Sequence, residues 1–115
     1  MCKKLILSLL MLVSSVNLHA ETAVCAGAVT RLAYHQPGGL YMAVGGSNIF
    51  KVCDPESLHK RTTPENCKMI ASFASTARVS GKSVKVLIDN ATTTSCLDIA
   101  AWFAADVRFV ELLDN

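Results

Sequence analysis

The feature that most constrains the fold is the stretch 62–88, TTPENCKMIASFASTARVSGKSVKVLI, in which the hydrophobic period changes once. In the first part apolar residues recur every three or four positions, which predicts an amphipathic helix. The face expected to be buried consists of Met69, Ile70, Phe73 and Ala77. From residue 84 to residue 88 every second residue is apolar and branched, which predicts a buried strand. An isolated helix of about four turns is marginal in water, so the remaining chain must supply an apolar surface for it.

Signals for the two ends of this helix are present in the sequence. Thr62 or Thr63 can cap the N-terminus with a hydroxyl, and counting from Thr62 places Glu65 at the capping-box position. Pro64 is tolerated in the first turn, where backbone N–H groups have no intrahelical partner. Gly81 is the expected C-terminal stop, because the residue there needs a positive φ.

The first twenty residues have the pattern of a secretory signal peptide. A basic start at Lys3 and Lys4 precedes an apolar run over residues 5–13, and Ala20 supplies a small residue at the cleavage point. A membrane anchor is the alternative, but the run is too short to span a bilayer. A lipid anchor on Cys25 is a second alternative and is disfavoured by the bulky valine before that cysteine. We therefore expect residues 1–20 to be removed and the mature chain, 21–115, to form one exported domain, in the periplasm or secreted.

The charge of the mature chain excludes two classes of partner. Removing Lys3 and Lys4 from the 11 basic residues of the whole chain leaves 9, which equal the 9 acidic residues. A neutral protein has no electrostatic basis for binding nucleic acid or anionic lipid. We expect no nucleic-acid partner and no membrane span in residues 21–115.

The mature chain keeps an even number of cysteines: Cys25, Cys53, Cys67 and Cys96. In a small exported domain this predicts two disulfides, each stabilising by about 2–4 kcal/mol. Four cysteines allow three pairings, and the sequence alone does not choose among them. Zinc is the alternative, but no C-x-x-C pair is present, so we expect no metal site.

The remaining pattern predicts mainly β structure with one helix. Expected strands cover residues 24–34, 40–44, 49–53, 83–88 and 107–113, and the ambiguous apolar run 97–105 is assigned to a short helix. Gly27 suggests a bulge or bend in the first strand. The order β-β-β-α-β-β fits an OB-like five-stranded Greek-key barrel with a helix after the third strand. An open antiparallel sheet with a helix across one face is the alternative.

No pattern points to an enzyme. His35 and His59 fall in loops, the cysteines are expected to be bridged, and no serine lies in a G-x-S-x-G context. Asp89 and Asp98 are better explained as a turn residue and a helix cap than as a catalytic pair. We therefore expect no catalytic residue and no cofactor.

A binding surface is easier to place. OB-folds bind ligands along strands two and three, bordered by the loops that here are 34–39 and 89–102. The candidate ligand-binding residues in this region are Tyr34, His35, Gln36, Tyr41, Asn90 and Trp102. The pair Trp102 and Phe103 is expected in the core, or alternatively in a ligand platform or subunit interface.

A resemblance adds to this interpretation. The pattern GAVTRL, GGLYMAVGGS, CKMIASFASTARVSGKSVKVLID and VRFVEL resembles small exported bacterial proteins with the toxin B-subunit type of OB-fold. Subtilase cytotoxin B and the pertussis-like and typhoid toxin B subunits belong to this group, which forms pentameric rings that bind host glycans. The resemblance implies disulfides between Cys53 and Cys96 and between Cys25 and Cys67. None of the family's sugar-binding residues is matched position by position.

The expected function is an exported binding or assembly module that resembles toxin B subunits, binds carbohydrate and forms a homo-oligomer. The expected partner is a host glycan or a protein. The alternative is a stand-alone periplasmic or secreted protein that has an interaction or structural role and no glycan site.

Overall fold

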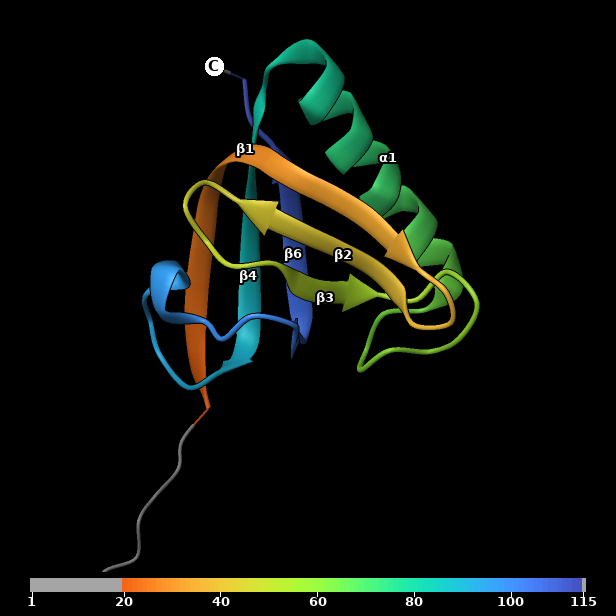
Figure 1. Cartoon of the computed structure of the whole chain (residues 1–115), viewed down its shortest axis with the longest axis horizontal. Coiled ribbons are helices and arrows are strands. Elements are labelled where there is room, and N and C mark those ends of the chain that lie inside the picture. Colours follow the sequence, from red (N-terminus) through yellow and green to blue (C-terminus); the bar gives the residue numbers. More distant parts are fainter. Residues whose placement is uncertain (1–19, 115) are drawn as a thin grey trace, which may run out of the picture.

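The protein is mainly β structure with one helix, in a computed structural model that describes residues 20–114. The predicted signal peptide lies outside this range, apart from Ala20. Six strands form one curled, mixed sheet, and α1 (Pro64–Ser80) packs against it (Figure 1). The strands are β1 (Glu21–His35), β2 (Gly39–Val44), β3 (Phe50–Cys53), β4 (Ser83–Ala91), β5 (Phe103–Ala104) and β6 (Val107–Leu112). Within residues 20–114 no helix is long and apolar enough to cross a membrane.

The long strand β1 bends and belongs to both halves of the sheet. Its first half pairs with β4 and its second half pairs with β2, as the orange ribbon in Figure 1 shows. The predicted bend at Gly27 is confirmed, since Gly27 has φ +147° and a Cβ there would lie 3.1 Å from the Cα of Gly45. The register shifts between Val29 and Arg31, and Arg78 of α1 donates to the Val29 carbonyl at 2.8 Å. The helix thereby holds the bent strand in place.

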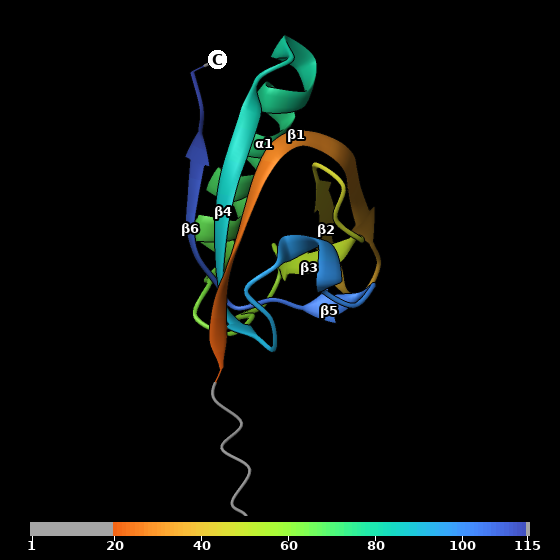
Figure 2. The ribbon, with the colours of Figure 1, turned by 90° about the vertical axis from the view of Figure 1, so that its left-hand side faces the viewer.

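The order of strands in the sheet is β5-β3-β2-β1-β4-β6, with β5 parallel to β3 and the other pairs antiparallel. The two strands at the ends of this order, β5 and β6, follow each other in the chain and are separated only by Ala105 and Asp106. Figure 2 shows the resulting curl, with β6 on one side and β5 beside β3. The five-stranded barrel is therefore not confirmed, because the structure has six strands.

The predicted short helix over residues 97–105 is wrong. Only Cys96–Asp98 form a turn of 3₁₀ helix, and Phe103 and Ala104 form β5. Phe103 packs against the core, whereas Trp102 has 60% of its surface exposed. Part of the second half of this apolar run therefore forms a strand of the sheet. Of its two aromatic residues, Phe103 is packed against the core and Trp102 is exposed.

The ends of α1 agree with the sequence signals, but its buried face does not. Thr63, rather than Thr62, is the N-cap and accepts a hydrogen bond from the Asn66 N–H at 3.2 Å. Gly81 ends the helix with φ +74°. The buried positions are Cys67, Ala74 and Ala77, with Ile70 and Ala71 partly buried beside them.

Two members of the expected helix face therefore lie elsewhere. Met69 is 58% exposed and Phe73 is only half-buried. The small side chains of Ala74 and Ala77 allow the helix to approach the sheet closely, and this turns the larger Met69 and Phe73 toward β6. The core itself comes mostly from the sheet, and its largest fully buried side chains are Phe50, Met42, Ile88, Val44, Val52, Val84 and Val86.

Both disulfides are present, but the pairing implied by the resemblance is wrong. Cys25 pairs with Cys96, and Cys53 pairs with Cys67. The second bridge joins the end of β3 to the first turn of α1, where Cys67 is fully buried. The first bridge joins β1 to the loop before β5. The helix is thus fastened to β3, and the loop that carries Trp102 is fastened to β1.

Candidate functional site

Three of the six predicted ligand-binding residues come together in an aromatic pocket, defined here as His35, Tyr41 and Trp102. Together they line a cavity of about 320 Å³. The ring of Tyr41 makes edge-to-face contacts with the other two rings, with centroids 6.2 Å from His35 and 5.5 Å from Trp102. Small-molecule sites in proteins begin at about 300 Å³ and are lined mainly by aromatic and apolar side chains. The aromatic pocket is therefore large enough for one small ring.

The hairpin of β1 and β2 places two of the three rings. Tyr41 lies opposite Ala33, and His35 lies two residues further along β1, so both side chains are on the same face. The turn between them closes tightly, since a Cβ on Gly38 would lie 3.1 Å from Nδ1 of His35. A larger residue at Gly38 would therefore push the His35 ring out of its position beside Tyr41.

Trp102 reaches the pocket from the turn before β5, in a backbone conformation that is rare for a bulky residue. Its φ is +68°, in the left-handed region that costs an L-residue about 1–2 kcal/mol. The Trp102 N–H donates to the Ile49 carbonyl at 2.7 Å, and Asn48 donates to the Ile99 carbonyl at 2.9 Å. Ile99 is buried, and Cys96 holds the start of the same loop through its disulfide. These contacts fix an exposed tryptophan in a strained conformation, which is more common at functional positions than elsewhere.

Two other predicted residues come from the same hairpin but do not line the pocket. Tyr34 lies opposite Leu40, so its side chain is on the other face of the hairpin from Tyr41. Partial burial and the carboxylates of Glu56 and Asp54 raise the pKa of the Tyr34 phenol. Gln36 is exposed in the β1–β2 turn.

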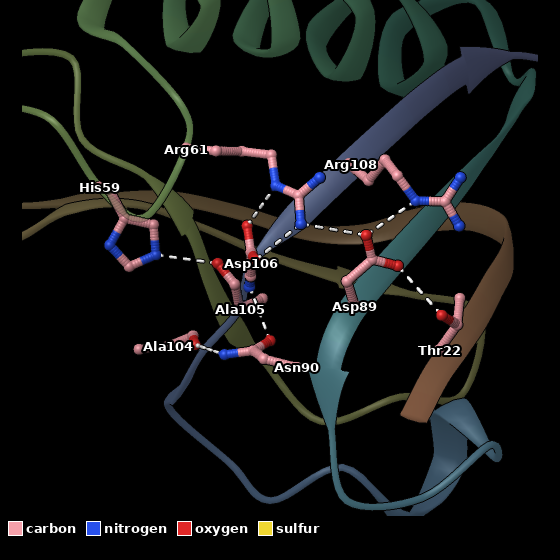
Figure 3. Close-up of polar contacts among 9 residues, drawn as sticks. All are labelled: Thr22, His59, Arg61, Asp89, Asn90, Ala104, Ala105, Asp106 and Arg108. Carbon is pink, nitrogen blue, oxygen red and sulfur yellow. Dashed lines mark hydrogen bonds and ion pairs between the residues drawn. The ribbon is translucent and has the colours of Figure 1, made fainter. Parts of the chain in front are cut away.

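Asn90 has a structural role that the sequence did not indicate. Its amide donates to the Ala104 carbonyl at 3.0 Å, and its side-chain oxygen accepts from the Asp106 N–H at 2.7 Å (Figure 3). Both hydrogen-bonding ends of the side chain are thus used to hold β4 to the link between β5 and β6. Asn90 does not line the aromatic pocket.

A polar network, defined as Thr22, Arg61, Asp89, Asp106 and Arg108, continues from this point. Arg61 donates to Asp106 at 2.8 and 2.9 Å and to Asp89 at 3.1 Å, while Arg108 donates to Asp89 at 2.7 Å (Figure 3). Thr22 also donates to Asp89, at 3.0 Å. The hydrogen bond from Arg108 lowers the pKa of Asp89, and that from Arg61 lowers the pKa of Asp106. The network ties β1, β4 and β6 to the loop before α1.

His59 joins the same region from the loop between β3 and α1. Its Nε2 lies 2.9 Å from the Ala105 carbonyl, and since a carbonyl only accepts, Nε2 carries the hydrogen. The side chain is buried, and this burial lowers the pKa of the imidazole, with Lys51 and Lys60 acting in the same direction. His59 is thus a packed, neutral side chain.

The polar network was not predicted from the sequence: of its charged residues only Asp89 was singled out, as a turn residue, and the structure places it in β4. The four arginine and aspartate residues come from three segments far apart in the chain, around residues 61, 89 and 106–108, and no spacing in the sequence connects these segments. Among residues 20–114 no group of three or more histidine, cysteine, aspartate or glutamate side chains is arranged to hold a metal ion. The chemistry that the aromatic pocket offers is contact with a ring face and hydrogen bonding from the phenol and imidazole.

Comparison with known proteins found no matching family model, no matching curated protein and no matching solved structure.

Proposed function

We propose that the protein is an exported carbohydrate-binding module that resembles toxin B subunits, with the sugar bound in the aromatic pocket. The observation that carries the proposal is the exposed ring of Trp102, fixed in a left-handed conformation beside Tyr41. The apolar face of a sugar ring stacks on aromatic side chains, and its hydroxyl groups need hydrogen-bonding partners such as the Tyr41 phenol and the His35 imidazole. Export is supported by the two disulfides.

We further propose that β5 and β6 are one interrupted strand of an OB-type barrel. They are separated by only two residues, and they pair with β3 and β4, the strands on either side of α1 in the chain. In this arrangement the hairpin turn and the loop before β5 are the two ligand-binding loops of the fold. The aromatic pocket lies where they meet.

A glycan array tests the binding proposal. The parent protein should bind a defined set of glycans, and Tyr41→Ala and Trp102→Ala should lose that binding. Tyr34→Ala is the matched control, because Tyr34 has similar exposure to Trp102 but lies on the other face of the hairpin. Equal binding by all four proteins, or no glycan bound by the parent, would exclude a sugar site here.

Oligomerisation and export have their own tests. A single shallow sugar site is weak, so a useful lectin needs several sites in one assembly. Light scattering at micromolar concentration should therefore show an oligomer, whereas a monomer would contradict this part of the proposal. The intact mass of the exported protein should correspond to a chain that begins at Glu21, and retention of Met1 would contradict signal cleavage.

A further inference from the structure

A second surface, separate from the aromatic pocket, lies between the helix and the last strand. We call it the α1–β6 groove, and its volume is about 270 Å³. Its apolar walls include Met69, which is 58% exposed, and Phe109, which is 42% exposed. The other residues that line it are Arg61, Thr62, Asn66, Ile70, Phe73, Val107, Arg108 and Val110. Met69 and Phe73 are the two side chains that α1 turns away from the core.

The groove runs along a sheet edge with unused backbone groups. Among the strands of residues 20–114, β6 is the last in the order of the sheet and pairs only with β4. The Leu113 N–H donates to the Ser83 carbonyl across this pair, so by alternation Glu111 and Phe109 also direct their backbone groups toward β4. The N–H and C=O of Val110 and Leu112 therefore face the open edge. Such an edge is a template for another strand.

Two arginines and no carboxylate are among the residues that line the α1–β6 groove. Arg61 and Arg108 have side chains 48% and 49% exposed, whereas their partners Asp106 and Asp89 are only 22% and 19% exposed. Arg108 uses Nε for Asp89, and Figure 3 shows its two terminal nitrogens directed away from that carboxylate. The groove thus presents guanidinium donors to a ligand, whereas the balancing carboxylates are less exposed and do not line it.

We propose that the α1–β6 groove binds an extended peptide segment of a partner protein, which adds to β6 as a further strand. Strand addition obtains affinity from main-chain hydrogen bonds and specificity from pockets for alternate side chains. Apolar side chains of the segment pack on Met69 and Phe73, and a carboxylate of the segment binds the exposed nitrogens of Arg108 and Arg61. Such a charge-assisted contact is stronger than a neutral hydrogen bond.

Fluorescence polarisation with defined peptides tests the proposal on the whole exported protein. The probes are two labelled peptides, each with a segment of alternating valine and threonine between glycine–serine flanks. One peptide carries a single aspartate at the N-terminal end of this segment, and the other carries it at the C-terminal end. Whichever of the two binds more tightly should bind about tenfold more tightly than the same peptide with asparagine, the difference expected for one charge-assisted contact. Methylation of alternate backbone nitrogens in the peptide should abolish binding, because it removes the hydrogen bonds of an added strand.

Protein variants locate the binding. Met69→Ser should weaken it severalfold, and Val79→Ser is the matched control, since Val79 is 89% exposed on the same helix but outside the groove. Arg108→Gln should remove the preference for aspartate over asparagine. In amide exchange spectra the peptide should protect Val110 and Leu112, and the same spectra verify that each variant is folded. Equal affinity for the aspartate and asparagine peptides, unchanged binding by Met69→Ser, or self-association through β6 that excludes the peptide would overturn the proposal.

Discussion

The rings of Tyr41 and Trp102 meet edge to face at 5.5 Å and join the second strand of the sheet to the turn that precedes β5. The two residues are far apart in the sequence. Tyr41 lies in a strand that was expected to bind a ligand, and Trp102 lies at the end of a loop that was expected to border the same site. The contact makes the position of one ring depend on the other. Changes at either position should therefore affect the same binding activity.

The left-handed backbone of Trp102 predicts a difference between two truncations. Glycine adopts φ +68° without steric cost, whereas alanine keeps a Cβ and most of the strain. Trp102→Gly should therefore be more stable than Trp102→Ala by about 1 kcal/mol, although both lose the ring that we propose to bind the sugar. Urea denaturation of the two variants measures this difference. An alanine variant at least as stable as the glycine variant would show that the turn is relaxed.

The two disulfides should contribute unequally to stability. Cys25 and Cys96 are 71 residues apart, and Cys53 and Cys67 are 14 apart. In the chain-entropy model the longer loop is worth about 1–1.5 kcal/mol more. Paired alanine substitutions at Cys25 and Cys96 should therefore lower the free energy of unfolding more than those at Cys53 and Cys67. Non-reducing peptide mapping checks the pairing, and a peptide linking Cys53 to Cys96 would refute it.

The buried face of α1 gives a third prediction. Ala74 is fully buried against the sheet, so Ala74→Leu should destabilise by about 1–3 kcal/mol through overpacking. Phe73 is only half-buried, and Phe73→Ala should cost less than the about 3–5 kcal/mol expected for Phe50→Ala in the core. Ser75→Ala, at an exposed position of the same helix, is the control. Equal losses for Phe73→Ala and Phe50→Ala in urea melts would show that the helix is rotated.

The carboxylates of the polar network predict acid sensitivity. The pKa values of Asp89 and Asp106 are lowered in the folded protein, so the unfolded chain binds protons more readily. The stabilisation is present above the ordinary aspartate pKa of 3.8 and is lost as the pH falls through the lower folded values. Guanidinium denaturation at a series of pH values should show this loss. Arg61→Gln should flatten the profile, and an unchanged slope in that variant would exclude a role for the ion pair.

His59 predicts a second loss of stability at milder pH. Burial lowers its pKa below 6.5, so protonation favours the unfolded chain. The contribution is present above pH 6.5 and decreases as the pH falls through 6.5 toward the lower folded value. An NMR titration of the ring measures that value directly. A pKa at or above 6.5 would mean that the imidazole is solvated rather than packed against Ala105.

The parts of the fold that follow from local chemistry were predictable from the sequence. The cap at Thr63, the stop at Gly81 and the bend at Gly27 depend on one or two neighbouring residues each. The run that includes Trp102 and Phe103 was not predictable, because its apolar residues have no clear period and the partner strand β3 decides the conformation. The buried face of α1 was predicted wrongly because two rows of apolar side chains overlap on the surface of the helix. Close packing against the sheet buries the row that contains the small side chains.

The candidate site, like the fold, was predictable only in part. Two converging regions with aromatic side chains were expected, and the structure does bring His35, Tyr41 and Trp102 together. Asn90 was included for its position in a loop, but its amide is satisfied by Ala104 and Asp106. A sequence does not reveal which loop side chains have already found partners within the protein.

The nested arrangement of the two disulfides has a consequence for how the chain matures. If the chain is exported as proposed, it leaves the translocation channel N-terminus first and exposes Cys25, then Cys53, then Cys67, and Cys96 last. An oxidant that joins thiols in order of appearance would link Cys25 to Cys53, which is not a native bond. Correct maturation therefore requires either that β3 and α1 dock before oxidation, or that an isomerase reshuffles the early bond by thiol–disulfide exchange. The yield of native protein in a host should accordingly depend on its isomerase activity as well as on its oxidising power.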